Sequence, residues 1–275
     1  MPFPIVLAHG IAPFDFLRQR LQDLHLLGPV AHADGLNYFR NIKTFLESNG
    51  FVAVPTRVSF AAPVEQRMQD LARQIQDILN EGREKVHIIG HSMGGLHTLW
   101  YAANNPNAPD GLILAASSIA MREKVSVKLF IRMAFHLLFA RRAMLDMYKS
   151  DSKEFKESQE FKDHTEFLVN DPLCTGKFTW RYLASIAPLL RKAPQNASRI
   201  GVPTLMIQGE VDRMVSPTGA KKVFEKLASK DKLLQIFADA DHYFYHVIFP
   251  RVTSKYDLGK KKQVTNAISD WLKTH

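Results

Sequence analysis

Short apolar runs recur along the chain and alternate with amphipathic segments. The runs are mostly continuous, which is typical of strands that are covered on both faces. They occupy residues 4–10, 51–56, 86–92, 111–117, 203–209 and 233–239. Residues 63–80 instead repeat apolar side chains every three or four positions, which predicts an amphipathic helix. This alternation predicts an α/β fold in which helices cover both faces of a mostly parallel central sheet.

The alternation stops at residue 119 and resumes at residue 200. The intervening segment is helix-like, shows no clear strand, and is far longer than a crossover connection requires. We therefore predict one core domain, formed by residues 1–118 and 200–275, with a helical cap inserted at residues 119–199. Ordinary crossover helices are the alternative.

One predicted helix of the cap carries a basic stripe, because Lys124, Lys128, Arg132 and His136 recur every four residues. Most of its remaining surface is apolar, with Val127, Phe130, Ile131, Phe135, Leu138 and Phe139. A basic stripe beside a broad apolar face suits a lid that rests on an anionic lipid surface or over an acyl-chain pocket. A helix buried on the core with a solvated basic edge is the alternative.

The composition is that of an ordinary globular protein, with 46% hydrophobic and 23% charged residues in 275. A chain of this length buries a substantial core without disulfides, and the single cysteine, Cys174, excludes an internal one. The net charge is +9, and residues 119–199 contribute 15 − 9 = +6 of it. No nucleic-acid-binding motif accompanies this charge, so we expect no nucleic-acid partner.

The first residues read as a strand and not as a signal peptide, since a basic n-region and a cleavage site are missing. No apolar run approaches the length of about 18 residues that a membrane span requires. We therefore expect a cytoplasmic protein, with a mature secreted form as the alternative. The sequence does not indicate an oligomeric state.

The apolar run at residues 86–92 ends in Gly90-His91-Ser92-Met93-Gly94, a G-x-S-x-G pattern that precedes a helix-like segment. Between a strand and a helix, this pattern predicts a strained turn that projects the serine hydroxyl from the edge of the sheet. The amide of Met93 then lies at a helix N-terminus, where N–H groups can bind an anion. Ser92 is therefore the candidate nucleophile, and Met93 is a candidate oxyanion donor.

A serine nucleophile requires a base and a carboxylate that orients the base. Asp212 and His242 follow the last two apolar runs, in the chain order serine, acid, histidine. Both lie just past the carboxyl ends of predicted strands, where open α/β sheets place their sites. Glu210 is the alternative acid.

Two further features bear on the site. Gly10, after the first apolar run, permits a close approach of the backbone, and the amide of Ile11 is the second candidate oxyanion donor. A metal pair of His242 and His246 is conceivable, but no third ligand is evident. We therefore expect neither a metal nor a cofactor.

These motifs resemble those of the α/β-hydrolase superfamily across almost the whole chain. The first hundred residues, with "PIVLAHGI" and "KVHIIGHSMGGL", are similar to bacterial triacylglycerol lipases. Later segments, "NDPLCTGKFTWRYLASI", "VPTLMIQGEVDRMVSP" and "ADADHYFYH", are similar to monoacylglycerol lipases and lysophospholipases. The resemblance implies the α/β-hydrolase fold, with Ser92 as nucleophile, Asp212 as acid and His242 as base. It also implies Ile11 and Met93 as oxyanion donors.

The expected function is hydrolysis of carboxylic esters, such as monoacylglycerols, through an acyl-enzyme. An apolar cap over a serine site favours an acyl chain, and four cap residues are predicted to line its pocket: Phe130, Phe135, Phe178 and Trp180. The expected partners are an acyl ester and a lipid surface. A thioesterase or acyltransferase on the same fold, and a non-catalytic binding protein, are the alternatives.

Overall fold

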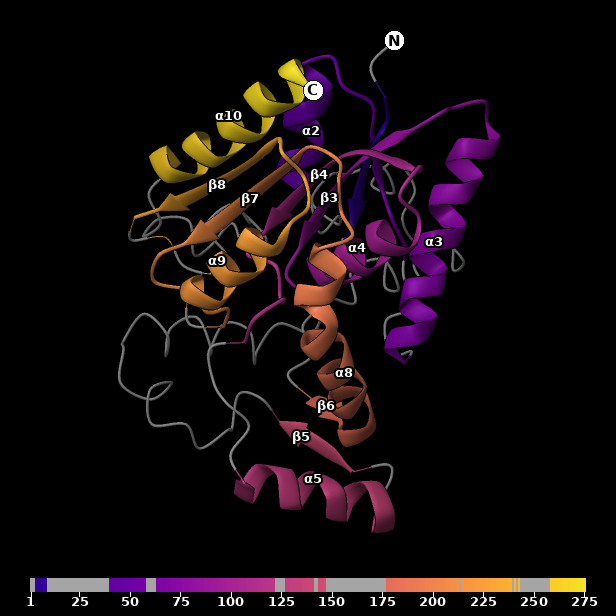
Figure 1. The fold of residues 1–275 in the computed structure, drawn as a ribbon, viewed down its shortest axis with the longest axis vertical. Coiled ribbons are helices and arrows are strands. Elements are labelled where there is room, and N and C mark those ends of the chain that lie inside the picture. The colour runs from indigo at the N-terminus through magenta and orange to yellow at the C-terminus, as the bar shows by residue number, and fades with distance from the viewer. Residues whose placement is uncertain are drawn as a thin grey trace, which may run out of the picture.

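The computed structural model describes residues 3–8, 40–57, 63–121, 127–140, 143–146, 177–212, 214–238, 240, 242 and 258–275. Within these residues, six strands form one parallel sheet in the order β2-β1-β3-β4-β7-β8 (Figure 1). Each predicted apolar run overlaps one of them: β1 (Ile5–Ala8), β2 (Ala53–Pro55), β3 (Val86–His91), β4 (Pro109–Ala115), β7 (Thr204–Gly209) and β8 (Lys232–Phe237). The predicted parallel sheet is confirmed.

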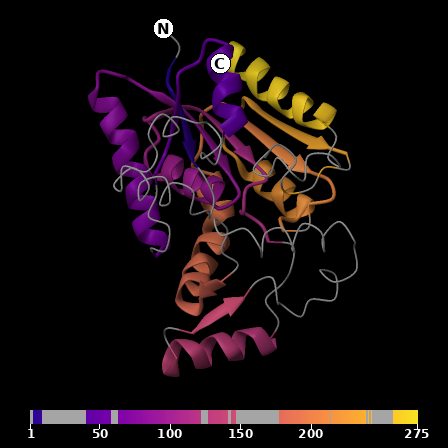
Figure 2. The ribbon, with the colours of Figure 1, turned by 180° about the vertical axis from the view of Figure 1, so that it is seen from behind.

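Helices cover both faces of this sheet (Figures 1 and 2). One face carries α2 (Arg40–Ser48) and α10 (Leu258–Thr274), which contact each other. The other carries α3 (Val64–Asn80), α4 (Met93–Asn104), α8 (Trp180–Ala197) and α9 (Pro217–Lys226). The helix α3 matches the predicted amphipathic segment, and it turns its apolar side chains toward the core.

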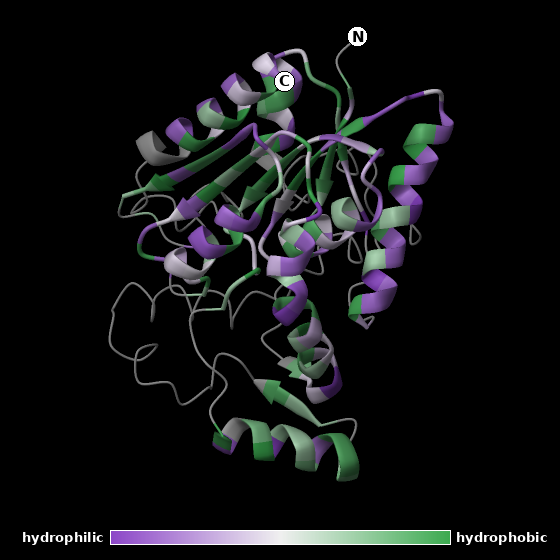
Figure 3. Ribbon diagram, in the orientation of Figure 1, coloured by the Kyte–Doolittle hydropathy of each residue, from purple (hydrophilic) through white to green (hydrophobic). Residues whose placement is uncertain are grey.

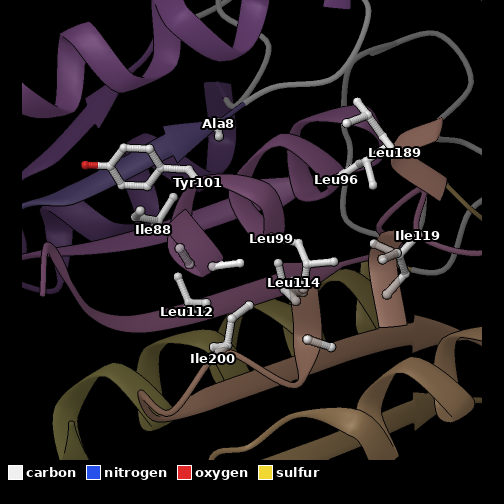
Figure 4. Packing of buried hydrophobic residues seen from close by; sticks show 14 of the residues in the cluster. Ala8, Ile88, Leu96, Leu99, Tyr101, Leu112, Leu114, Ile119, Leu189 and Ile200 are labelled. Atoms are coloured by element: carbon white, nitrogen blue, oxygen red, sulfur yellow. The ribbon is translucent and has the colours of Figure 1, made fainter. Parts of the chain in front are cut away.

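Successive residues of each strand face opposite sides of the sheet, and the burial of both sides explains why the runs are continuously apolar. In β1, Ile5 and Leu7 pack under α2 and α10, whereas Val6 and Ala8 belong to the core on the opposite face. Figure 4 shows part of that second core, which includes Leu96 and Leu99 of α4 and Leu112 and Leu114 of β4. Because both faces of the strands are buried, both sets of side chains must be apolar.

Between β4 and β7, the described residues form α5 (Val127–Phe139), β5 (Met144–Asp146), β6 (Lys177–Thr179) and α8. The strands β5 and β6 pair in antiparallel fashion, so the expectation of a segment without strands was wrong. A three-residue strand is too short to show an alternating pattern in the sequence. Figures 1 and 2 place α5 beyond the end of α8, away from the sheet, while α8 contacts α4 and α9.

The apolar face of α5 is exposed. Six of its residues are 56–76% exposed: Val127, Phe130, Ile131, Phe135, Leu138 and Phe139. Figure 3 shows that hydrophobic residues make up most of α5. The opposite face contacts the start of α8, where His136 stacks on Trp180 with ring centroids 5.0 Å apart. The alternative of a helix buried on the core was therefore wrong. Lys124, the first residue of the predicted basic stripe, lies outside the described residues.

None of the helices that the structure describes is both long and apolar enough to span a bilayer.

Candidate active site

The turn between β3 and α4 holds Ser92 in a strained conformation, with φ 53° and ψ −125°. A non-glycine residue with such angles costs about 1–3 kcal/mol and persists only when its surroundings enforce it. Here the enforcement comes from the backbone of the next strand. The Ser92 amide donates to the Ala115 carbonyl at 3.2 Å, and the Ser118 amide donates to the Ser92 carbonyl at 2.8 Å.

Two glycines allow this turn to be so tight. A Cβ on Gly90 would lie 2.6 Å from Thr98 Oγ1 and 2.7 Å from the Gly95 Cα. A Cβ on Gly95 would lie 1.9 Å from Ser117 Oγ and 2.5 Å from Ser117 Cβ. The requirement at Gly90 agrees with the G-x-S-x-G interpretation. Gly95 lies outside that motif, and the Gly94-Gly95 pair was the only sequence signal for it.

Ser92, His242 and Asp212 form one hydrogen-bonded chain, although 150 and 30 residues separate its members. His242 Nε2 lies 3.1 Å from Ser92 Oγ, and His242 Nδ1 lies 3.0 Å from Asp212 Oδ2. Ser92, His242 and Asp212 are only 9%, 3% and 0% exposed, so water hardly competes for these hydrogen bonds. Ser92 and Asp212 follow β3 and β7, and His242 follows β8, at the carboxyl edge of the sheet.

Asp212 is held as a carboxylate. Its Oδ1 accepts from the amides of Met214 and Val215 at 2.8 Å each, and its Oδ2 accepts from Gln208 Nε2 at 2.9 Å. Burial alone would raise the pKa of Asp212. The hydrogen bond and electrostatic interaction with His242, and the hydrogen bonds from Val215 and Gln208, outweigh burial and lower that pKa.

The alternative acid is not in the chain of hydrogen bonds. Glu210 is exposed, whereas Asp212 is fully buried against His242. The carboxylate of Asp212 has no proton to donate, so the proton of the shared hydrogen bond is on His242 Nδ1. In the neutral imidazole Nε2 is then an acceptor, and the Ser92 hydroxyl donates to it. This is the protonation state in which the imidazole can act as a base.

Three residues of the site were missed from the sequence. His91 Nε2 donates to the His242 carbonyl at 3.1 Å, which fixes the backbone of the base. Gln208 binds Asp212, and its signal was a polar residue at the end of an otherwise apolar strand. Ser118 Oγ lies 3.3 Å from Ser92 Oγ and gave no sequence signal.

The other residues predicted for the site are Met93, Ile11 and His246. Met93 is the first residue of α4, so its amide is at the helix N-terminus as expected. Ile11 and His246 lie outside the described residues. Within the described ranges, no group of three or more His, Cys, Asp or Glu side chains is placed to hold a metal ion.

The predicted pocket residues all lie in the cap. Trp180 is buried at the start of α8, and Phe178 stacks on Tyr182 with ring centroids 5.7 Å apart. Phe130 and Phe135 are on the exposed face of α5. None of the contacts described for these four cap residues is with Ser92, His242 or Asp212, so their role in a pocket stays a prediction.

Comparison with known proteins identifies the family. The family model described as Hydrolase_4, serine aminopeptidase S33, matches residues 47–246, a range that contains Ser92, Asp212 and His242. The chain belongs to this family. The rat (Rattus norvegicus) monoglyceride lipase is similar to this chain, with 25% identity over 189 residues. The matched residues are 68% of this chain and span only 61% of the rat enzyme. A triacylglycerol lipase of Vibrio cholerae is 30% identical over 118 residues, which are 42% of this chain and 31% of that enzyme.

Solved structures confirm that this Hydrolase_4 chain has the predicted α/β-hydrolase fold. The monoacylglycerol lipase of Paleococcus ferrophilus superposes with a TM-score of 0.70 at 20% identity, and the match covers 99% of this chain and 96% of that one. A soluble variant of Saccharomyces cerevisiae monoglyceride lipase, in complex with a substrate analog, gives a TM-score of 0.71 at 18% identity, with coverage of 100% and 87%.

Proposed function

We propose that this protein is a serine hydrolase that cleaves carboxylic esters of acyl chains in two steps. The observation that supports this most directly is the buried chain of hydrogen bonds from Ser92 through His242 to Asp212. Such a chain activates a hydroxyl that is otherwise a weak nucleophile. The strained backbone of Ser92, between a strand and a helix, adds to it because strain of this kind clusters at active sites.

In the first step, Ser92 Oγ attacks the ester carbonyl while its proton passes to His242 Nε2. Asp212 keeps its negative charge, holds Nδ1–H and stabilises the imidazolium. His242 then protonates the leaving alcohol, and an acyl-enzyme remains. In the second step, His242 takes a proton from water and the resulting hydroxide attacks the acyl carbon. The bond between that carbon and Ser92 Oγ then breaks, His242 returns the proton to Ser92 Oγ, and the fatty acid leaves. The amide of Met93, together with that of Ile11, would bind the oxyanion, each donor contributing about 3 kcal/mol.

We infer that the substrate is an acyl ester such as a monoacylglycerol. The relatives named monoglyceride lipase support this inference, as does the apolar cap that joins the core through α8. In this proposal residues 119–199 form the cap over a core of residues 1–118 and 200–275. Phe178 and Trp180 would contact the acyl chain, whereas Phe130 and Phe135, also predicted to do so, lie on the exposed face of α5. The two steps require only protein groups and water.

Substitution of the nucleophile tests the proposal. Ser92→Ala should abolish hydrolysis of a nitrophenyl acyl ester, and labelling by a fluorophosphonate, while thermal unfolding stays cooperative. Ser198→Ala is the control, because Ser198 is exposed at the C-terminal end of α8 and its hydroxyl donates to the Gln195 carbonyl of the same helix. Wild-type rates in Ser92→Ala would refute the mechanism. A panel of acylglycerol, acyl-CoA and short-chain esters would identify the substrate class.

The exposed face of α5 supports a second element of the proposal, which is binding to an anionic lipid surface. Its six large apolar residues are 56–76% exposed. Single apolar residues on a protein surface need no explanation, but several on one helix face are typical of an interaction site. Lys128 and Arg132 are exposed on the same helix, and residues 119–199 carry a net charge of +6 (15 − 9). An apolar face bordered by basic side chains is typical of helices that lie in a bilayer interface. Each basic residue contributes about 1 kcal/mol near anionic lipid.

Vesicle sedimentation distinguishes the two contributions. The wild-type protein should bind vesicles that contain phosphatidylserine more strongly than vesicles of phosphatidylcholine alone. Phe135→Ser should weaken binding to both, while Lys128→Glu should weaken binding only to the anionic vesicles. Leu233→Ser is the control, since Leu233 is an apolar residue of similar exposure, 46%, on β8. Equal binding by Phe135→Ser and Leu233→Ser would contradict the proposed surface.

A further inference from the structure

We propose that Ser118 is a positioning residue for the nucleophile, and that its hydroxyl donates a hydrogen bond to Ser92 Oγ. This inference rests on the proposed function and adds a fourth group to the triad. Ser118 Oγ lies 3.3 Å from Ser92 Oγ, and the side chain is buried, with 3% of its surface exposed. The same residue also donates its backbone amide to the Ser92 carbonyl at 2.8 Å. Ser118 therefore contacts both the backbone and the side chain of the nucleophile.

Strain in the backbone brings Ser118 to this place. In the described part of the chain, the non-glycine residues with positive φ are Ser92, at 53°, and Ala116, at 39°. Ala116 directly follows β4, and its amide is held by the Ile207 carbonyl at 2.8 Å. The turn that it makes directs Ser118 back toward Ser92. Strained residues thus lie on both sides of the contact, and strain of this kind is kept where a function depends on it.

The direction of the hydrogen bond follows from the triad. Asp212 has no proton, so His242 carries one on Nδ1 and accepts at Nε2. The Ser92 proton is committed to Nε2 at 3.1 Å. Ser92 Oγ can then take part in the contact with Ser118 only as an acceptor, and Ser118 must donate.

This arrangement orients the attacking oxygen. A hydroxyl oxygen has one proton and two lone pairs. In Ser92 the proton points to His242 and one lone pair accepts from Ser118, so one lone pair is left for the ester carbon. During attack the Oγ–H bond breaks, the proton moves to Nε2 and an Oγ–C bond forms. Ser118 keeps its own proton throughout, and its hydrogen bond holds Oγ in position for attack while the negative charge develops on the carbonyl oxygen of the ester.

The expected effect is on the chemical step and not on substrate binding. Ser118→Ala should lower kcat for a nitrophenyl acyl ester about three- to tenfold, the range expected for one neutral hydrogen bond, and leave KM within twofold. The maximal rate of inactivation by a fluorophosphonate should fall by the same factor, because that reaction also requires attack by Ser92. Ser118→Thr, which keeps the hydroxyl, should restore kcat.

The matched control is Ser117→Ala. Ser117 is the preceding buried serine, and its described hydrogen bond is from its hydroxyl to the Gly90 carbonyl at 3.5 Å and not to Ser92. Its kcat should stay within twofold of the wild type. Equal kcat values for Ser118→Ala and Ser117→Ala would overturn the inference. So would a Ser118→Thr variant that unfolds at the wild-type temperature and is as slow as Ser118→Ala. If the wild-type protein neither hydrolyses esters nor reacts with the fluorophosphonate, the proposed function itself fails, which is a different result.

Discussion

Replacement of Asp212 by asparagine should inactivate the enzyme by changing which nitrogen of His242 carries the proton. Among the described residues, four groups donate to Asp212: the amides of Met214 and Val215 to Oδ1, and Gln208 Nε2 and His242 Nδ1 to Oδ2. Asparagine has a single oxygen and an NH₂ group. Because the two backbone amides can only donate, the asparagine oxygen must stay on their side. The NH₂ group then faces His242 and Gln208.

The magnitude follows from this orientation. The NH₂ group donates to His242 Nδ1, so the imidazole proton moves to Nε2, and Ser92 loses its acceptor. A wrong tautomer of the base lowers kcat by about 10⁴-fold, or roughly 5 kcal/mol. The NH₂ group also faces Gln208 Nε2, so two hydrogen-bond donors face each other in a buried site. The free energy of unfolding should therefore fall by about 1–3 kcal/mol.

The assay is kcat for a nitrophenyl acyl ester at neutral pH, normalised to folded protein, with unfolding followed by urea titration. Glu210→Gln is the matched control, because Glu210 is an exposed carboxylate two residues away. Its kcat should equal that of the wild type. A kcat for Asp212→Asn within tenfold of the wild type would refute the reasoning, and so would an equally large loss in Glu210→Gln.

Two further predictions concern stability. Gly95→Ala should lower the free energy of unfolding by about 1–3 kcal/mol, because its Cβ would lie 1.9 Å from Ser117 Oγ. Ser117→Gly in the same chain should recover part of the loss in urea titrations, and no recovery would exclude this clash as the cause. Burial lowers the pKa of His87 in the folded protein below the ordinary value of 6.5. As the pH falls below 6.5, His87 therefore binds a proton more readily in the unfolded chain than in the folded one, and the free energy of unfolding decreases. His87→Phe should show a smaller drop in unfolding temperature between pH 7 and 5.5, and an unchanged drop would contradict this assignment.

The sheet was predictable because its strands are buried on both faces. Burial of alternate residues on opposite faces, such as Ile5 on the side of α2 and Val6 on the side of α4, makes most positions of each run apolar. This pattern is local and can be read from consecutive residues. The two strands of the cap escaped prediction for the opposite reason. Each has three residues, and that length carries no periodicity.

The site was predictable as far as motifs and chain order extend. G-x-S-x-G indicated Ser92, and the strand ends indicated Asp212 and His242. The choice between Asp212 and Glu210 remained open, because both follow the same strand. Only the folded chain buries one carboxylate against His242 and leaves the other exposed. The contacts of Ser118 and His91 link residues 26 and 151 positions apart, and no local pattern records such a pairing.

The helix α5 shows the limit of sequence patterns most clearly. By itself, the sequence determined that Phe135 and Ile131 share an apolar side of a helix, and that basic residues lie beside it. It did not determine whether that side meets the core or faces outward. Periodicity records which residues share a face, because that depends on 3.6 residues per turn. What the face contacts depends on the path of the whole chain, and here the tertiary structure places α5 so that its opposite side meets Trp180 and its apolar side is exposed.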